Sequence, residues 1–312
     1  MHLFQRNELL MGNRFDLGVV GDDEVKANQA LEKAIIEIKR IEALLSTYQA
    51  NSQINQVNSN AGISPVKVDE EVFNLVERAQ RISELTQGAF DLSYGSLDKS
   101  LWNFDQNMKQ LPSKELAKNA VHLINFKNIL LDRANETIFL AKKGMRIGFG
   151  GIGKGYAADQ AKKVLVGLGF TDGIVNASGD MCAWGKRADG EDWTVGISNP
   201  DFPRDILSEF SLNDSAVATS GNYEKFVLID GQKYSHTIHP KTGFPIQGIK
   251  SVTVFAPFAE LADALTTPIA VMGVEVGLHL MNQMKGVACI IIDDANQVFS
   301  TKNIHEKSLA LA

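Results

Sequence analysis

The sequence predicts a mixed α+β fold that forms one large domain over residues 1–312. Apolar residues at helical spacing alternate only in part with short strand-like runs, which favours a mixed α/β domain over a regular doubly wound sheet. No internal repeat, low-complexity tract or Pro/Ser-rich linker divides the chain. The length allows one large domain or two modest ones, each with a real core.

The amino-terminal part is predicted to contain one strand and two amphipathic helices. The strand covers residues 13–20, and Asp22 or Asp23 is the expected N-cap of a helix over 24–45. In that helix Leu31, Ile35 and Ile38 recur at helical spacing. A second helix is predicted over 69–85, and two short strands over 129–131 and 137–141.

The carboxy-terminal part is predicted to follow a glycine-rich loop with further strands and helices. A helix over 154–168 comes directly after the loop, and the buried strand GIVNA covers 173–177. More strands are expected over 193–197, 226–229, 251–256 and 287–292, and helices over 259–272 and 274–284. Pro268 removes a backbone donor, so we expect a kink or a restart of the helix there.

Composition and charge exclude several classes of protein. Hydrophobic residues make up 44% and charged residues 22%, as in ordinary soluble domains. The net charge of −6 argues against a nucleic-acid binder, although a local basic pocket for a small phosphorylated ligand remains compatible with it. The apolar runs fall short of the roughly 18 residues that a membrane span needs. Cys182 and Cys289 are far apart, which favours two buried free thiols.

The first residues, MHLFQRNELLMGNRF, contain no apolar signal region and no lipid-attachment cysteine. The expectation for the chain as given is therefore a soluble, cytoplasmic protein. A periplasmic location is expected instead if an export signal was removed.

The run GFGGIGKGYAADQA starts at Gly148 and resembles two phosphate loops without fitting either. A P-loop needs a Ser or Thr where this chain has Gly155, and a dinucleotide fingerprint needs an acid that ends the following strand. What remains is a set of uncovered amides beside a helix N-terminus, with Lys154 placed against the helix dipole. A bound phosphate or carboxylate would relieve that misfit. The alternative is a packing loop whose glycines allow close helix–sheet approach.

The segment ELADALTTPIAVMG places Asp263, Thr266 and Thr267 three and four residues apart, on one helical face. One carboxylate and two hydroxyls are hard oxygen ligands of the kind that suits Mg²⁺. The alternative is an ordinary helix with a solvent-facing Asp.

Three loops carry further candidate residues. SHTIHPKTGFP contains His236 and His239, and a loop histidine can act as a general base near neutral pH or simply be hydrogen-bonded. Pro240 disfavours a helix at His239, so the two rings are not expected to form a metal pair. In LSTYQANSQINQVN an exposed Tyr48 could stack on a flat ring or simply cap the core, and TQGAFDLSYGSL has the character of a ligand loop and equally of a tight turn.

Taken in order, these segments resemble the ApbE family, the FAD:protein FMN transferases. The resemblance covers about residues 11–273 and rests on eight segments in the right order. They are MGNRF, LSTYQANSQINQVN, GAFD, GGIGKGYAAD, NASGD, AVATSGNYEKF, SHTIHPKTG and ADALTTPIAVMG. The resemblance implies an ApbE-like, T-fold-related architecture with a central cleft.

The resemblance also implies a role for particular residues. Those expected to hold FAD are Met11, Tyr48, Ala89, Phe90, Asp91, Lys154 and Thr237. Those expected to ligate Mg²⁺ are Asp263, Thr266 or Thr267, and the carbonyl of Gly151. His236 is the expected base that activates the acceptor hydroxyl.

The implied activity is a Mg²⁺-dependent transfer of FMN from FAD to a Thr or Ser of a target flavoprotein, with release of AMP. A Mg²⁺-dependent FAD pyrophosphatase and a non-catalytic FAD-binding protein are the alternatives. The chain departs from the family pattern at Gly148 and at His239, where the family has Asp. The first change removes a side-chain contact to FAD, and the second alters the surroundings of His236.

Overall fold

The computed structural model describes residues 1–98, 110–198, 200–201, 206–221, 226–229 and 232–304. Helices and strands are mixed along the chain, which confirms the α+β class. The chain forms two compact units: Met1–Glu42 with Gly151–Gly221 and Lys250–Ala312, and Ala43–Gly150 with Asn222–Ile249. The single domain over 1–312 stays a prediction.

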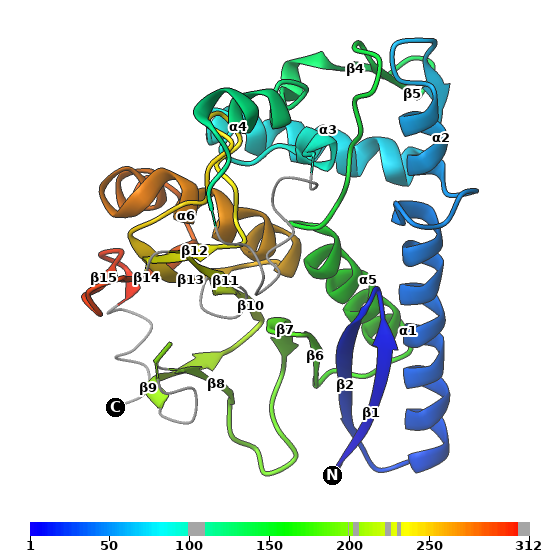
Figure 1. Ribbon diagram of the computed structural model, residues 1–312. Coiled ribbons are helices and arrows are strands. Elements are labelled where there is room, and N and C mark those ends of the chain that lie inside the picture. The colour runs from blue at the N-terminus through cyan, green and yellow to red at the C-terminus, as the bar shows by residue number, and fades with distance from the viewer. Residues whose placement is uncertain (99–109, 199, 202–205, 222–225, 230–231, 305–312) are drawn as a thin grey trace. The chain divides into compact units, whose positions relative to one another are not determined.

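The first unit is built on an eight-stranded sheet (Figure 1). Its strand order is β1-β2-β6-β7-β10-β13-β14-β15, and neighbours from β1 to β13, like β14 and β15, pair antiparallel. The strands are β1 (His2–Leu10), β2 (Asn13–Gly21), β6 (Gly173–Ala177), β7 (Asp180–Trp184), β10 (Ser215–Gly221), β13 (Ile249–Ala256), β14 (Ala288–Asp293) and β15 (Val298–Ser300).

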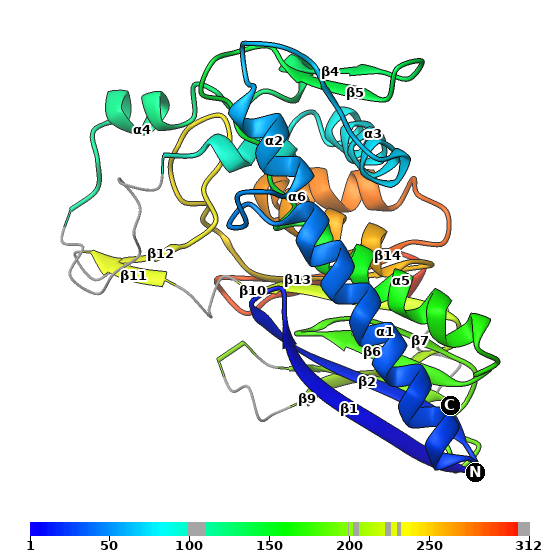
Figure 2. The ribbon, with the colours of Figure 1, turned by 90° about the vertical axis from the view of Figure 1, so that its right-hand side faces the viewer.

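Two helices, α5 (Gly153–Gly167) and α6 (Ala259–Met281), pack against each other and against the middle of this sheet (Figure 2). The carboxylate of Asp159 on α5 accepts the amides of Ala259 and Glu260 at 3.0 and 2.8 Å, so α5 supplies the cap that α6 lacks at its own start. On β7 the side chain of Cys182 faces α5, because its thiol lies 3.7 Å from the carbonyl oxygen of Ala158, and Lys162 of the same helix lies over the ring of Trp184.

The helix α1 (Glu24–Leu45) belongs to the same unit as far as Glu42, and Arg6 of β1 reaches Glu32 at 3.3 Å. The amide of Lys26 donates to the carboxylate of Asp23 at 3.0 Å, which confirms Asp23 as the N-cap.

The helix α6 breaks at Gly273, where φ is 80° and ψ is 176°, so the predicted division into two helices is confirmed. The predicted kink at Pro268 is wrong. Pro268 stays inside the helix and the bend falls at the next glycine, because only glycine reaches a positive φ without strain. Of the helices in the described ranges, α6 alone is long and apolar enough to cross a membrane, and its packing makes it a core helix of the first unit.

The opposite face of the sheet is covered by a hairpin of β8 (Trp193–Ser198) and β9 (Ile206–Leu212). Phe210 of this hairpin packs against Phe255 of β13 with ring centroids 4.9 Å apart and the rings tilted by 51°, and Val217 and Ile290 of the sheet join the same buried cluster. Because side chains alternate across a strand, one face of the sheet binds helices and the other binds this hairpin.

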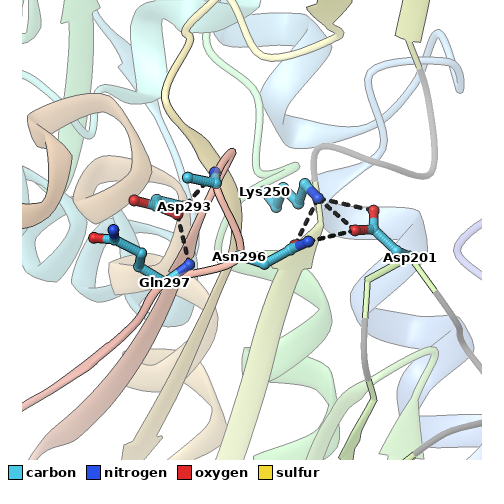
Figure 3. Close-up of polar contacts among 6 residues, drawn as sticks. Asp201, Lys250, Asp293, Asn296 and Gln297 are labelled. Atoms are coloured by element: carbon cyan, nitrogen blue, oxygen red, sulfur yellow. Dashed lines mark hydrogen bonds and ion pairs between the residues drawn. The ribbon is translucent and has the colours of Figure 1, made fainter.

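A polar cluster of Asp201, Lys250 and Asn296 links three segments of this unit (Figure 3). Lys250 Nζ at the start of β13 contacts both carboxylate oxygens of Asp201 at 2.8 and 2.6 Å and the side-chain oxygen of Asn296 at 2.6 Å. Asn296 also donates to Asp201 at 2.8 Å. The cluster joins the turn between β14 and β15 to the segment that follows β8, and it contains none of the predicted site residues.

The second unit combines short helices with small sheets. Its elements are α2 (Gln53–Ser59), β3 (Val66–Lys67), α3 (Glu70–Leu85), η1 (Leu92–Ser96), α4 (Lys114–Ala120), η2 (Phe126–Asn128), β4 (Ile129–Asp132), β5 (Thr137–Leu140), β11 (Phe226–Ile229) and β12 (Gln232–Ser235). The strands form a three-stranded sheet, β3-β5-β4, and a β11–β12 hairpin. A buried cluster of Leu97, Ala120, Val121 and Ile238 joins η1 and α4 to the loop after β12.

Candidate functional site

The glycine loop ends where α5 begins, and Gly155 in the first turn of α5 lies directly against α6. A Cβ at this position would lie 2.2 Å from the carbonyl oxygen of Ala259 and 2.9 Å from Cβ of Asp263. Only a residue without a side chain allows the two helices to approach this closely. Gly155 is therefore a packing glycine, but the close approach that it allows is between two helices, α5 and α6, and not between a helix and the sheet.

This close approach brings Asp263 to the N-terminus of α5. Asp263 Oδ2 accepts the amide of Gly155 at 3.0 Å, and the amide of Lys154 donates to the same carboxylate. Burial raises the pKa of the Asp263 carboxyl, while Lys154 and the two amides act in the opposite direction. The carboxylate that the positive helix end was expected to bind is thus supplied by the protein itself.

Lys154 has a second acidic neighbour, Asp180, whose carboxylate forms an ion pair with Nζ. Asp180 is 3% exposed and Asp263 is 5% exposed. No role was predicted for Asp180, although it lies in the segment NASGD, because its contact with Lys154 depends on a hairpin. Ser178 and Gly179 have φ values of 55° and 100°, and this two-residue turn pairs Ala177 with Asp180.

The cluster of Lys154, Asp180 and Asp263 carries two buried carboxylates against one ammonium group. Such an excess of buried negative charge is costly unless a cation or a proton offsets it. Thr266 Oγ1 donates its proton to the carbonyl of Asp263 at 2.9 Å, which leaves the hydroxyl lone pairs available as ligands.

The predicted Mg²⁺ ligands are compatible with this cluster. A carboxylate, threonine hydroxyls and a backbone carbonyl are hard oxygen donors, and the local charge excess favours a divalent cation. Thr266 is buried and Thr267 follows it in a half-buried position of α6, while Gly151 lies two residues before α5. The described residues contain no group of three or more His, Cys, Asp or Glu side chains that could hold a metal, so any such site depends on hydroxyl and carbonyl oxygens.

His236 and Thr237 lie in the second unit, in the loop that follows β12. The His236 side chain is exposed, whereas Thr237 is 6% exposed. The carbonyl of Thr237 accepts the amide of Ile246 at 2.9 Å, and Ile238 forms a bridge with Pro245. The loop is therefore a small hairpin that presents His236 at its base.

The Ala89-Phe90-Asp91 turn lies at the end of α3. The hydroxyl of Thr86 accepts the amide of Phe90 at 3.0 Å, and this bond shapes the turn. The Asp91 carboxylate is occupied within the protein: it accepts the amide and the hydroxyl of Ser93 at 2.8 and 2.6 Å and the amide of Phe126 at 2.7 Å. Burial raises the pKa of Asp91, and these bonds act against that shift. A contact from this turn to a ligand would therefore come from its backbone or from Phe90.

Tyr48 and Met11 occupy exposed turns. Tyr48 is 94% exposed, in the loop between α1 and α2, so its ring face is available for stacking. Met11 lies in the turn between β1 and β2 with a φ of 51°, and its carbonyl accepts the side chain of Asn13 at 3.0 Å. The structure thus places Lys154 and Asp263 together in one unit, with Met11 in a turn of that same unit. Tyr48, Asp91 and His236 are found in the other unit.

The conserved pattern of the ApbE family matches residues 11–291. The FAD:protein FMN transferase of Treponema pallidum is 31% identical over 97% of this chain and 88% of its own length. The enzyme of the same name from Escherichia coli K12 is 29% identical over 93% of this chain and 84% of its own length.

Solved structures have the same fold. The ApbE protein of Thermotoga maritima has a TM-score of 0.88 and 29% identity, with 98% of this chain and 99% of that chain covered. The flavinyl transferase ApbE of Pseudomonas stutzeri, in its apo form, has a TM-score of 0.86 and 28% identity, with 98% and 97% covered. The fold and the named relatives together show that the chain is a transferase, as the sequence predicts. The chain belongs to the ApbE family.

Proposed function

We propose that this protein is a Mg²⁺-dependent FAD:protein FMN transferase that moves FMN from FAD to a Thr or Ser hydroxyl of a target flavoprotein and releases AMP. Its relatives in Treponema pallidum and Escherichia coli carry the name FAD:protein FMN transferase, which supports the transfer of FMN from FAD to a protein. The single observation that carries the proposal is the cluster at the start of α5, where Lys154 is paired with Asp180 and lies beside buried Asp263.

In this proposal the cluster binds the diphosphate end of FAD. Asp263, Thr266 or Thr267, and the carbonyl of Gly151 hold Mg²⁺, which when bound supplies positive charge that polarises a phosphoryl group. Lys154 neutralises phosphate charge and stabilises AMP as the leaving group. The N-terminus of α5 adds its own partial positive charge in the same place.

The residues of the second unit orient the rest of the substrates. Tyr48 offers an exposed ring for stacking, and the 89–91 turn offers backbone groups for the adenine-containing part of FAD. Met11 in the first unit and Thr237 also contact FAD in this proposal. His236 takes the proton of the acceptor hydroxyl, whose oxygen then bonds to the FMN phosphorus while the bond from that phosphorus to AMP breaks.

The proposal is tested by incubating the protein with FAD, MgCl₂ and a target domain that contains one reactive Thr. The measurement is the mass of the target, with free FMN and AMP followed by chromatography. We expect the target to gain the mass of covalent FMN, and a Thr→Val target to remain unlabelled. Free FMN without target labelling would instead show a pyrophosphatase, and intact bound FAD would show a carrier.

Variants assign the roles. His236→Asn and Asp263→Asn are each expected to lower the labelling rate by about 10² to 10⁴, as for loss of a general base or of an electrostatic ligand. Asp16→Asn, an exposed acid of β2 that pairs with Arg14 at 2.9 Å, is the matched control and should label normally. Normal labelling by either site variant would remove that residue from the mechanism.

A further inference from the structure

The loop that carries His236 is held by three contacts that none of the roles above uses. The amide of Ile238 donates to the hydroxyl of Tyr94 at 3.0 Å. The amide of His239 donates to the carbonyl of Phe244 at 2.8 Å, which closes the hairpin. The amide of Lys241 donates to Nδ1 of His239 at 3.1 Å. The position of His236 therefore depends on the residues that follow it.

The contact made by His239 resembles an Asx turn. In that turn a side-chain oxygen accepts a hydrogen bond from the backbone amide two residues later, and the oxygen usually belongs to Asp or Asn. Here an imidazole nitrogen occupies that place. A ring nitrogen accepts a hydrogen bond only while it carries no proton, because a protonated imidazole has two donors and no acceptor. The turn is thus made by the neutral form of His239.

The surroundings of His239 also favour the neutral ring. Desolvation lowers the pKa of His239 and the ammonium group of Lys241 lowers it further, while a hydrogen bond with its own backbone acts in the opposite direction without reversing the shift. A hollow of about 340 Å³ against this turn is lined by Lys118, His122 and Lys241, and no carboxylate is among its described lining residues. The helix α4 packs on the turn so closely that a Cβ at Gly243 would lie 1.9 Å from the carbonyl of Ala117.

Tyr94, the other side chain that tethers the loop, does not share this sensitivity to acid. Burial raises its pKa to about 12, so its hydroxyl keeps its proton throughout the range from about pH 5 to about pH 8. Tyr94, Thr242 and Ser235 also bond to the 237–246 backbone, and none of their hydroxyl groups titrates near neutral pH, whereas the imidazole of His239 is of a type that does.

We propose that His239 is a positioning residue for His236: its unprotonated Nδ1 holds the Lys241 amide, and protonation of this ring opens the turn and displaces His236. The proposal rests on the proposed function for the role of His236 as base. It adds a second titrating group, outside the reacting atoms, on which flavin transfer depends.

The test uses the full chain and three variants. Asn places an oxygen where His has Nδ1 and does not titrate, so His239→Asn keeps the turn without the proton switch. His239→Asp also places an oxygen acceptor in the turn, and this oxygen carries a negative charge. His239→Ala removes the acceptor. The first measurement is amide hydrogen exchange at Lys241 by NMR from about pH 5 to about pH 8. The second is the ring signal of His236 in the same samples, and the third is the labelling rate at saturating FAD.

In the wild type we expect the Lys241 amide to be protected at neutral pH and to lose protection as the His239 ring takes up a proton. His239→Asn should stay protected throughout, and His239→Ala should be unprotected throughout with a shifted His236 signal. On the acid side the wild-type labelling rate should fall by up to about a hundredfold per pH unit, since both rings must be neutral, and that of His239→Asn by about tenfold.

Two results would overturn the proposal. One is a His239→Ala variant in which the Lys241 amide is as protected as in the wild type and the His236 signal is not shifted. The other is an acid limb in His239→Asn as steep as that of the wild type. The exchange and ring measurements need no flavin, so they report on the turn even if no variant transfers FMN, which would refute the proposed function alone.

Discussion

Gly155→Ala is the most direct test of how the cluster at the start of α5 is assembled. The added Cβ would lie 2.2 Å from the carbonyl oxygen of Ala259, about 0.8 Å inside the 3.0 Å limit below which something must shift. The atom in the way is backbone of α6, so a side-chain rotation cannot relieve the clash. The two helices must separate, and the 3.0 Å bond from the Gly155 amide to Asp263 is lost.

Overpacking of this kind costs about 1–3 kcal/mol, and the lost bond to a buried carboxylate about 1.5–3 kcal/mol. We therefore expect Gly155→Ala to lower the free energy of unfolding by about 3–5 kcal/mol, and the melting temperature by on the order of 10 °C. Urea unfolding followed by circular dichroism measures the first, and calorimetry the second.

The matched control is Gly167→Ala in the same helix. Nothing lies within 4 Å of a Cβ at Gly167, and alanine is the better helix former, so the stability should be unchanged or raised by up to about 1 kcal/mol. Equal stability of the two variants would refute the argument that Gly155 is kept small by α6.

Two further predictions concern the acidic groups around these helices. Asp180→Asn removes one of the two buried carboxylates beside Lys154. Under the proposed function it should therefore weaken Mg²⁺ binding by about tenfold in titration calorimetry, whereas Asp16→Asn should leave Mg²⁺ binding unchanged. Equal Mg²⁺ affinities of the two variants would contradict the charge argument. Burial raises the pKa of Asp159, so the native state holds this proton more tightly than the unfolded chain, and the free energy of unfolding should fall as the pH rises through the window between the two pKa values. Urea unfolding from about pH 4 to about pH 6 should show a shallower fall in Asp159→Asn, and the reasoning fails if the slopes are the same.

Long periodic helices and buried strands were predictable from the sequence, because their pattern is local. The helix α1 and the strand β6 have the predicted residues. The strand β1 was missed because HLFQRNELL is an edge strand with polar residues and exposed apolar ones, and Leu9 is 77% exposed. The seven-residue helices α2 and α4 are too short for a helical period to be visible.

For the candidate site, the sequence indicated residue types but not their partners. Lys154 was recognised as misplaced at a helix N-terminus, yet the identity of the two carboxylates beside it depends on helix packing and on strand register. Asp91 shows the reverse case. A carboxylate in a ligand-like loop is indistinguishable in sequence from one that binds its own backbone, as this one does.

The helices α5 and α6 each receive at their first turn a carboxylate from the other: Asp263 reaches the start of α5, and Asp159 reaches the start of α6. Each helix therefore gains a side-chain cap for its leading amides only when the two dock, which couples the stability of one helix to that of the other. A ligand that binds at this junction would bind only the docked pair of helices, so the melting temperature of the first unit should rise with the concentration of that ligand.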